Sequence, residues 1–286
     1  MESVIVLAAG ESRRMGVGGT PKALLPLVPR APSSPSFLSR NLELFRARGV
    51  QRVFLVVNPA HRAVFAPYAD DLVHIVPVAS GGGPAGSTVS LLTGLRALLR
   101  WRPEGTRVLV TDADVVYERS VLHSPAAFTG SRLLTVDRVS GDGEEVRVYG
   151  RSAEQPVLIG KGLRQAMTQG LDLLGESLGL ILLDAAEVPT AAEVAAWIVG
   201  DPPASRPYGF SGRLSEHEEV WQYLFALGRL PVARLPAALL FSECDVPEDY
   251  RHVQEFLYPA IVKREAVSVR PENVQLAEQE VVPGMP

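Results

Sequence analysis

The sequence predicts an α/β protein of the Rossmann-like kind, with a mostly parallel central sheet, flanking helices and a small antiparallel lobe. Short apolar runs such as 4–9 and 52–58 stop at glycine or polar residues, which is typical of buried parallel strands. Segments with apolar residues spaced by three and four, such as 37–48, separate these runs and predict amphipathic helices. The regular alternation ends after about the first hundred residues, and we expect the small lobe beyond that point.

Composition limits the classes of function. The chain has 286 residues, 47% of them hydrophobic, which suffices for one large α/β domain. A formal net charge of −4 argues against nucleic acid binding as the main role. Cys244 is the only cysteine, so an intramolecular disulfide and a cysteine-based zinc site are both excluded. We find no signal peptide and no apolar run long enough to span a membrane, and therefore expect a cytoplasmic protein.

The first predicted strand, 4–9, leads into a loop rich in glycine and arginine. Open α/β sheets bind ligands at the carboxyl ends of their strands, where this loop begins. Its small residues allow backbone N–H groups to approach a phosphate, and Arg13, Arg14 and Lys22 supply positive charge. The alternative is an ordinary glycine-rich turn with solvated arginines, because the loop matches neither G-x-G-x-x-G nor a Walker A sequence.

The next elements continue the α/β alternation. The proline- and serine-rich stretch 28–36 predicts an exposed connection. A glycine-rich loop at 79–86 then precedes Ser87, which we expect to cap a helix that runs to about residue 100. This loop is either a flexible surface segment or a second backbone wall around a ligand at a helix N-terminus. The intervening predicted elements are a helix at 37–48, strands at 52–58 and 74–78, and a short helix at 61–68.

An acidic pair follows the strand predicted at 108–110. Asp112 and Asp114 are separated by one residue, so on an extended chain their side chains point the same way. Two carboxylates at the carboxyl end of a buried strand suit a hard cation such as Mg²⁺. The alternative is that both aspartates merely form a turn.

The second half of the chain mixes strands and helices. Lys161 ends a predicted strand and is either an exposed turn lysine or a ligand for an acceptor's phosphate. Trp221 and Tyr223 belong either to the core or to the wall of a pocket that attracts a cationic ammonium group. The predicted strands are 131–136, 145–149, 155–160, 179–183 and 237–241, and the predicted helices are 189–199 (with Thr190 as its cap), 216–227 and 248–257. We assign 1–258 to one domain and 259–286 to a C-terminal tail.

Three motifs together resemble one superfamily. The first reads Leu-Ala-Ala-Gly-x-x-x-Arg-Met-Gly from Leu7 and is followed by Pro-Lys-Ala-Leu-Leu. The second is Asp-Ala-Asp-x-x-Tyr from Asp112, and the third is Asp-x-Pro-Glu-Asp-Tyr from Asp245. They resemble the MobA-like and sugar-phosphate nucleotidyltransferases, most of all the phosphocholine and phosphonate cytidylyltransferases. Ser12 departs from the second glycine of many relatives, and Cys244 stands where an apolar residue is usual.

The resemblance implies a role for each matching residue. Lys22 and Arg13 would be catalytic, Asp114 and Asp245 would hold Mg²⁺, and Asp112 would be a support or second ligand. Residues of the two glycine-rich loops and the first aspartate would bind the nucleotide: Leu7, Ala8, Ala9, Gly10, Glu11, Ser12, Arg14, Gly82, Gly86, Ser87 and Asp112. Residues of the small lobe and its neighbours would bind the acceptor: Lys161, Tyr117, Glu219 and Trp221.

The implied reaction is Mg²⁺-dependent, in-line transfer of a nucleotidyl group with release of pyrophosphate. The expected partners are an NTP, with CTP favoured, and a small phosphate or phosphonate acceptor, without nucleic acid or membrane; a homodimer is left open. A sugar-1-phosphate nucleotidyltransferase using another NTP is the close alternative. A nucleotide-binding module without catalysis is the alternative from another class, although the lysine and both aspartates speak against it.

Overall fold

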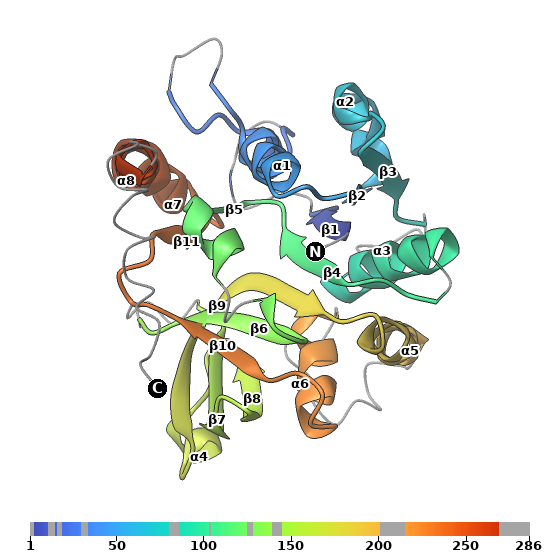
Figure 1. Ribbon diagram of the computed structural model, residues 1–286, viewed down its shortest axis with the longest axis vertical. Helices are drawn as coiled ribbons and strands as arrows, with labels where there is room; N and C mark the ends of the chain where they lie inside the picture. Colours follow the sequence, from blue (N-terminus) through green and yellow to red (C-terminus); the bar gives the residue numbers. More distant parts are fainter. Residues whose placement is uncertain are drawn as a thin grey trace, which may run out of the picture.

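A computed structural model describes most of the chain (Figure 1). The described residues are 3–10, 15, 19–29, 34–79, 86–102, 104–124, 128–138, 145–200 and 215–268. Several predicted site residues therefore lie outside the description, namely Glu11, Ser12, Arg13, Arg14 and Gly82. Within the described ranges, every helix is too short or too polar to cross a bilayer.

A mostly parallel sheet forms the centre of the molecule, as predicted (Figure 1). Only β9 of its seven-strand path runs antiparallel to its neighbours, β4 and β6. The order of strands is β10 (Val232–Leu235), β6 (Arg132–Val136), β9 (Asp172–Leu183), β4 (Val108–Asp112), β1 (Ser3–Ala8), β2 (Arg52–Val57) and β3 (Val73–Pro77). Two smaller antiparallel arrangements complete the strands: β7 (Arg147–Ser152) with β8 (Gln155–Gly160) beside β9, and β5 (Val115–Tyr117) with β11 (Phe241–Glu243).

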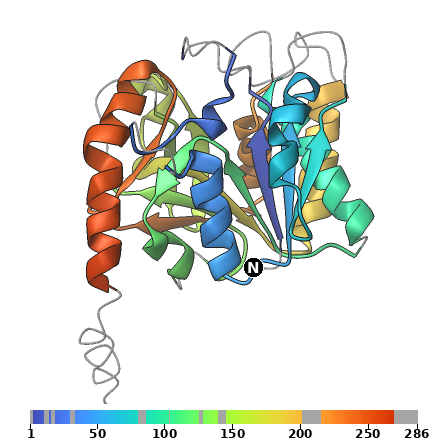
Figure 2. The same cartoon turned by 90° about the horizontal axis from the view of Figure 1, so that it is seen from above.

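Helices cover both faces of the sheet, and the side chains of β1 alternate between the two resulting cores. Ile5 and Leu7 pack in the core that contains α3 (Ser87–Trp101), α5 (Glu187–Gly200) and α6 (Glu218–Ala226). Val4 and Val6 pack in the opposite core, which contains α1 (Phe37–Ala47) and Phe65 of α2 (Arg62–Phe65). Figure 2 shows α1 and α5 on opposite sides of the strands. All six residues of β1 are buried, which explains the continuous apolar run of its sequence.

Helix α3 lies very close to the sheet because it carries a glycine at the contact. A Cβ on Gly94 would lie 2.5 Å from Cγ2 of Ile5 and 3.1 Å from Cγ2 of Val56. Gly94→Val should therefore force α3 away from β1 and β2. We expect a loss of about 2–3 kcal/mol in the free energy of unfolding, measured by urea denaturation. Gly200→Ala at the end of α5 is the control, because a Cβ there meets nothing within 4 Å; equal stability of the two variants would contradict this packing.

Three predicted boundaries are corrected by hydrogen bonding. Gly86, rather than Ser87, is the N-cap of α3. Helix α5 begins at Glu187, ahead of the expected cap Thr190, because the Glu187 N–H bonds the Asp184 carbonyl at 2.9 Å. The strand expected at 237–241 is wrong: Leu239 N–H closes a turn on the Pro236 carbonyl at 2.9 Å. The sheet strand lies earlier, at β10, and pairs with β6.

The folded chain also continues beyond residue 258, where the sequence predicted a tail. Helix α8 (Tyr258–Ser268) follows α7 (Pro247–His252) through a π-helical stretch, Val253–Leu257. Ile261 of α8 is fully buried, and Glu265 pairs with Arg40 of α1 at 2.5 Å. Residues 259–268 are therefore packed on the domain, while 269–286 lie outside the described residues.

Candidate active site

Strand pairing places three carboxylates together at the carboxyl end of the central strands. Asp114 lies in the turn between β4 and β5, and its carbonyl accepts a hydrogen bond from the Cys244 N–H at 3.1 Å. The antiparallel pairing of β5 with β11 sets Glu243 opposite Val115. Asp245 lies two residues after Glu243. Its backbone N–H donates a hydrogen bond to Oδ2 of Asp249 at 2.9 Å. The local cap of α7 thus fixes the second aspartate beside the first.

Lys22 lies between the two aspartates. Its Nζ donates to Oδ1 of Asp245 at 2.9 Å and forms an ion pair with Oδ2 of Asp114. Burial alone would lower the pKa of Lys22, but the charges of Asp114 and Asp245 outweigh it and raise that pKa above its ordinary value. Lys22 is therefore a permanent cation at physiological pH.

The same cluster has the chemistry of a cation site. Oxygen atoms of Asp114, Glu243 and Asp245 lie within 4.8 Å of one another. The crowding of the cluster partly desolvates the Glu243 carboxyl, and together with repulsion from Asp114 and Asp245 this raises its pKa, although the residue is exposed at its surface. Burial likewise raises the pKa of Asp114, although Lys22 opposes the shift. The three carboxylates repel one another, and one partly buried lysine balances only part of their charge. Additional positive charge would therefore stabilise the site.

Two recesses meet at this cluster. The first has a volume of about 260 Å³ and lies between the end of β1, the segment Pro21–Ala23 and the start of α3. Among the residues predicted to bind nucleotide, the described ones all line it: Leu7, Ala8, Ala9, Gly10, Gly86, Ser87 and Asp112. The second, of about 400 Å³, lies toward β8, β9 and α6. Both recesses are lined by Ser87, Asp112, Glu216 and Glu243, so they are neighbouring halves of one site.

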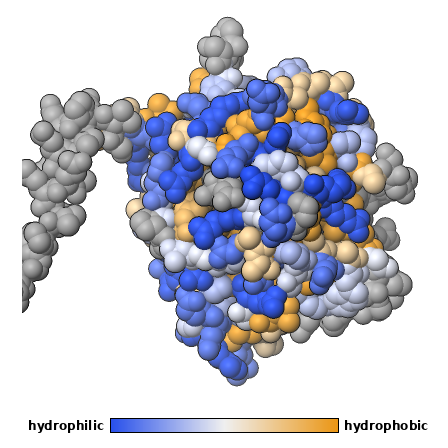
Figure 3. All heavy atoms as spheres, turned by 45° about the vertical axis from the view of Figure 1, so that its right-hand side comes forward, coloured by the Kyte–Doolittle hydropathy of each residue, from blue (hydrophilic) through white to orange (hydrophobic). Residues whose placement is uncertain are grey.

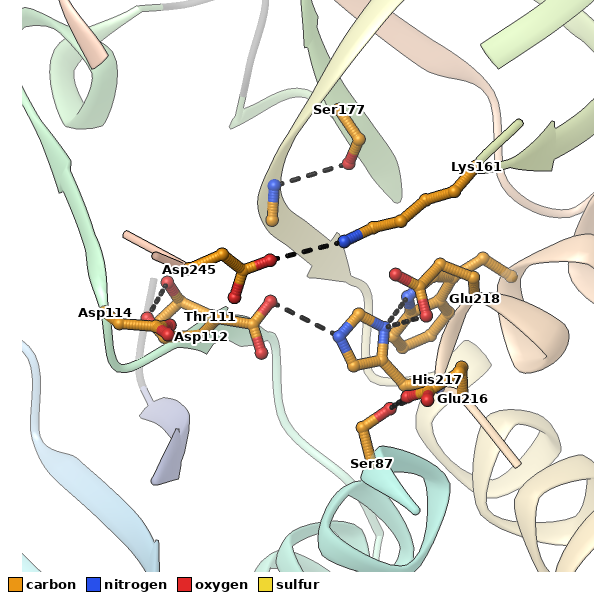
Figure 4. Close-up of polar contacts among 12 residues, drawn as sticks. Ser87, Thr111, Asp112, Asp114, Lys161, Ser177, Glu216, His217, Glu218 and Asp245 are labelled. Atoms are coloured by element: carbon orange, nitrogen blue, oxygen red, sulfur yellow. Dashed lines mark hydrogen bonds and ion pairs between the residues drawn. The ribbon is translucent and has the colours of Figure 1, made fainter. Parts of the chain in front are cut away.

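The second recess contains only some of the residues predicted for the acceptor. Lys161 lines it, and Nζ of Lys161 lies 3.5 Å from Oδ2 of Asp245 (Figure 4). Trp221 borders the recess, but its side chain is fully buried in the core that contains α6. Tyr117 is corrected to a core residue, because its side chain is fully buried in the apolar cluster that contains α1. Glu219 is corrected as well: it is buried, and its Oε1 accepts the Glu216 N–H at 3.2 Å at the start of α6.

Glu243 and the polar residues at the start of α6 were not predicted as site residues. Glu243 is one residue before Cys244 and carries no motif, so only the pairing of β11 with β5 places it in the site. The run Glu216-His217-Glu218 looked like the charged first turn of a helix. All three residues line the second recess. In the sequence, the only sign that these residues belong to a site is that Glu216 and Glu218 lie close to Trp221.

Helix α3 and the segment before α6 are joined at the boundary of the two recesses. The Ser87 hydroxyl donates to Oε2 of Glu216 at 2.7 Å and accepts the His217 backbone N–H at 2.7 Å (Figure 4). Gly86 permits this approach, because a Cβ there would lie 2.0 Å from the Ser215 carbonyl oxygen. Ser87 therefore connects two elements rather than capping α3.

His217 connects the acidic pair to the wall of the second recess. Its Nε2 lies 3.3 Å from Oδ2 of Asp112, and its Nδ1 lies 3.1 Å from Nε1 of Trp221 (Figure 4). Oε2 of Glu218 is 3.5 Å from the same Nδ1. A neutral ring accepts from Trp221, whereas a protonated ring donates to Asp112 and Glu218 instead. Burial disfavours the charged ring, but Glu218, Asp112 and Glu216 outweigh it and raise the pKa of His217 to about 10.

This pKa shift makes stability depend on pH. Because the folded-state pKa is raised above the unfolded value of about 6.5, protonated His217 stabilises the fold fully below about pH 6.5. That contribution is lost as the pH rises toward about 10. The difference in unfolding free energy between wild type and His217→Gln should therefore shrink between pH 6 and pH 10, by about 1.4 kcal/mol per unit of pKa shift. Urea denaturation across this range tests it, and a difference that grows with pH would contradict it.

The fold and the site together are those expected of a nucleotidyltransferase: a mostly parallel sheet, a lysine held by two aspartates, and two adjoining recesses. Residues 4–179 match the MobA-like NTP transferase domain. The chain belongs to this family of MobA-like NTP transferases.

Solved structures agree on the fold. The inositol-1-phosphate CTP transferase from T. maritima is similar with a TM-score of 0.67 and 18% sequence identity, covering 92% of this chain and 96% of that chain. A putative glucose-1-phosphate thymidylyltransferase from Bacillus anthracis, in complex with a sucrose, has a TM-score of 0.62 and 14% identity over 88% of this chain and 93% of its own. No curated protein sequence matches the chain significantly.

Proposed function

We propose that this protein transfers a cytidylyl group from CTP to a small phosphate or phosphonate acceptor and releases pyrophosphate. One observation carries the proposal: the cation Lys22 and the carboxylates of Asp114 and Asp245 meet where two recesses adjoin. An acceptor oxygen in the second recess would attack the α-phosphorus of a nucleotide in the first. Such a reaction depends mainly on positioning and on stabilising negative charge.

The donor set fits Mg²⁺. Asp114 and Asp245 would hold it, and Glu243 offers a third oxygen within 4.8 Å of theirs. A bound magnesium ion would neutralise charge on the phosphates and orient them. The proposed reaction also needs Lys22. This lysine already pairs with both aspartates, and its ammonium group can turn to an incoming phosphate. Arg13 and Arg14, which follow β1 in the sequence, would add charge around the triphosphate.

Backbone groups would hold the rest of the nucleotide. The end of β1 supplies Ala8, Ala9 and Gly10, and Gly86 and Ser87 face them from the start of α3 across the first recess. Small residues on both walls leave space for a planar base and allow contact with backbone N–H and carbonyl groups. CTP remains our choice on the motif resemblance, and the neighbour named as a CTP transferase is consistent with it.

The charge of the second recess favours an acceptor with a positive group. Its lining carries five carboxylates, those of Asp112, Glu216, Glu218, Glu243 and Asp245. One of these, Asp245, pairs with Lys22, whereas Glu216 and Glu218 lie at the start of α6, beside His217. The carboxylates of Glu216 and Glu218 suit an ammonium group, and Lys161 suits a phosphate or phosphonate. Phosphocholine and aminoalkylphosphonates combine both groups. Sugar or polyol phosphates, after which both similar proteins are named, are the alternative acceptors.

A matrix of donors and acceptors tests the proposal. Pyrophosphate release is measured with each of the four common NTPs and with phosphocholine, 2-aminoethylphosphonate, inositol-1-phosphate or glucose-1-phosphate, in the presence of Mg²⁺. We expect acceptor-dependent release with CTP and a zwitterionic acceptor. Release only with a sugar phosphate, or with another NTP, would select the alternative. The absence of release with every pair would favour a non-catalytic nucleotide-binding module.

A lysine substitution tests the acceptor half separately. Lys161→Met should raise the KM for the acceptor about tenfold or more, by removal of a charged partner of the phosphate, and leave the KM for CTP unchanged. Lys263→Met on α8 is the matched control, because it removes the same charge outside both recesses. If both variants had the wild-type acceptor KM, Lys161 would not bind the acceptor.

A further inference from the structure

A basic groove lies away from the active site, between α3 and the edge strand β3. It has a volume of about 640 Å³. Figure 3 views the molecule from the side that carries β3 and α3, where hydrophilic side chains surround apolar surface. The groove lining combines three arginines with a histidine, two larger aromatic rings and small or aliphatic residues: Arg52, Arg96, Arg100, His74, Trp101, Phe54, Ile75, Val76, Pro77, Ala79, Thr93 and Ala97.

Its charge contrasts with the rest of the protein. The chain carries a net charge of −4, yet the described lining of this groove contains three arginines and no acidic residue. Solvated surface arginines usually have carboxylates nearby, as Arg46 has Asp70 at 2.6 Å on α1. Within the described part of the chain, Arg52, Arg96 and Arg100 form no ion pair with a carboxylate. The groove therefore concentrates positive charge around a concave surface.

Packing inside the protein holds the side chain of Arg52 in place at this groove. Its Nε is buried and has no hydrogen-bond partner among the described residues. Its guanidinium lies over the ring of Trp101, with Cζ 5.6 Å from the ring centroid, and Arg102 approaches the same ring at 4.8 Å. Phe54 supports Trp101 by an edge contact with centroids 5.9 Å apart. Trp101 and Phe54 thus hold the guanidinium of Arg52 in position before a ligand binds. Less conformational entropy is then lost on binding.

We propose that this groove is a second binding site for a di- or triphosphate group, either free as pyrophosphate or carried by a nucleotide. Arginine forks match phosphate oxygens, and three of them around one concavity can neutralise two or more negative charges. The exposed ring of His74 would accept a planar base if the phosphate belongs to a nucleotide. The proposal is independent of the transfer reaction, because no groove residue belongs to either active-site recess.

The site is tested by calorimetric titration of the full chain in the presence of chelator, with pyrophosphate and with CTP as separate probes. The Lys22→Ala background weakens binding in the active site and leaves the groove intact. In that background we expect one remaining equivalent of ligand to bind. Adding Arg96→Ala and Arg100→Ala should weaken its Kd about tenfold or more, as expected for the loss of charged hydrogen-bond partners. Both arginines are on the surface of α3, and cytidylyl transfer by the double variant with Lys22 intact should be unchanged.

The control for the Arg96→Ala and Arg100→Ala substitutions removes two arginines from outside the groove. Arg62→Ala with Arg151→Ala takes two exposed arginines from α2 and β7 and should leave the Kd as in the Lys22→Ala background. Binding of both probes supports a site for the phosphate group itself, and binding of CTP alone supports a nucleotide site. The proposal is overturned if no equivalent remains, if the control loses as much affinity, or if a short single-stranded RNA binds through Arg96 and Arg100 more tightly than CTP.

Discussion

Asp114→Asn and Asp245→Asn are each expected to lower kcat for nucleotidyl transfer by about 10³-fold or more, since several kcal/mol of charge stabilisation depend on this pair. Each aspartate contributes one side of the cage around Lys22 and one ligand of the proposed cation site. Asparagine keeps the shape and removes the charge. Steady-state pyrophosphate release at saturating Mg²⁺ and both substrates measures the effect.

The loss should not come from unfolding. Both aspartates lie at the ends of strands, outside the apolar clusters, and thermal melting should remain close to that of wild type. Asp71→Asn, in the exposed turn before β3, is the matched control and should leave kcat unaltered. Near-normal turnover by either site variant would show that this carboxylate pair does not hold the metal.

Lys22→Ala should lower kcat by at least about two orders of magnitude, the usual cost of removing one preorganised charged donor from a transition state. The variant also leaves Asp114 and Asp245 as neighbouring carboxylates without their shared cation. Their mutual repulsion should raise the pKa of the pair and make turnover fall further as the pH is lowered. Single-turnover kinetics at several pH values separates these two effects.

Lys22→Arg distinguishes charge from geometry. Arginine restores the charge, but its planar fork is bulkier than an ammonium group and cannot occupy the same position between two carboxylates. We therefore expect only partial recovery of kcat. If Lys22→Ala turned over as fast as wild type, the lysine would serve the fold alone, and the assignment of the first recess to a triphosphate would lose its main support.

The sequence predicted those parts of the site that depend on contiguous motifs at strand ends. Lys22, Asp114 and Asp245 belong to three such motifs, and the structure brings all three together. Asp112 and Asp114 both line the first recess, as their spacing of two on an extended chain predicted. Parallel strands point their carboxyl ends to one edge, so the location of the site follows from the fold class alone.

The remainder depends on contacts between distant segments. Tyr117 follows the acidic pair, but β5 is covered on both faces: Val115 and Tyr117 pack in one apolar cluster and Val116 in another. A strand of three residues is too short for its sequence to show that both of its faces are buried. Glu216 and His217 enter the site only because Gly86 lets Ser215 approach α3. Strand β10 was missed because its residues, Val-Ala-Arg-Leu, give too short a pattern to separate strand from loop.

The position of Lys22 has a consequence for how the protein behaves between catalytic cycles. By holding both aspartates, this lysine acts as an internal counter-ion, and the resting enzyme needs no dissolved cation to keep its acidic residues together. Chelators should therefore inhibit the enzyme without unfolding it. When a nucleotide binds, we expect its phosphates to offer the ammonium group new anionic partners and to release the carboxylates. Metal binding by Asp114 and Asp245 would in this way depend on the presence of substrate.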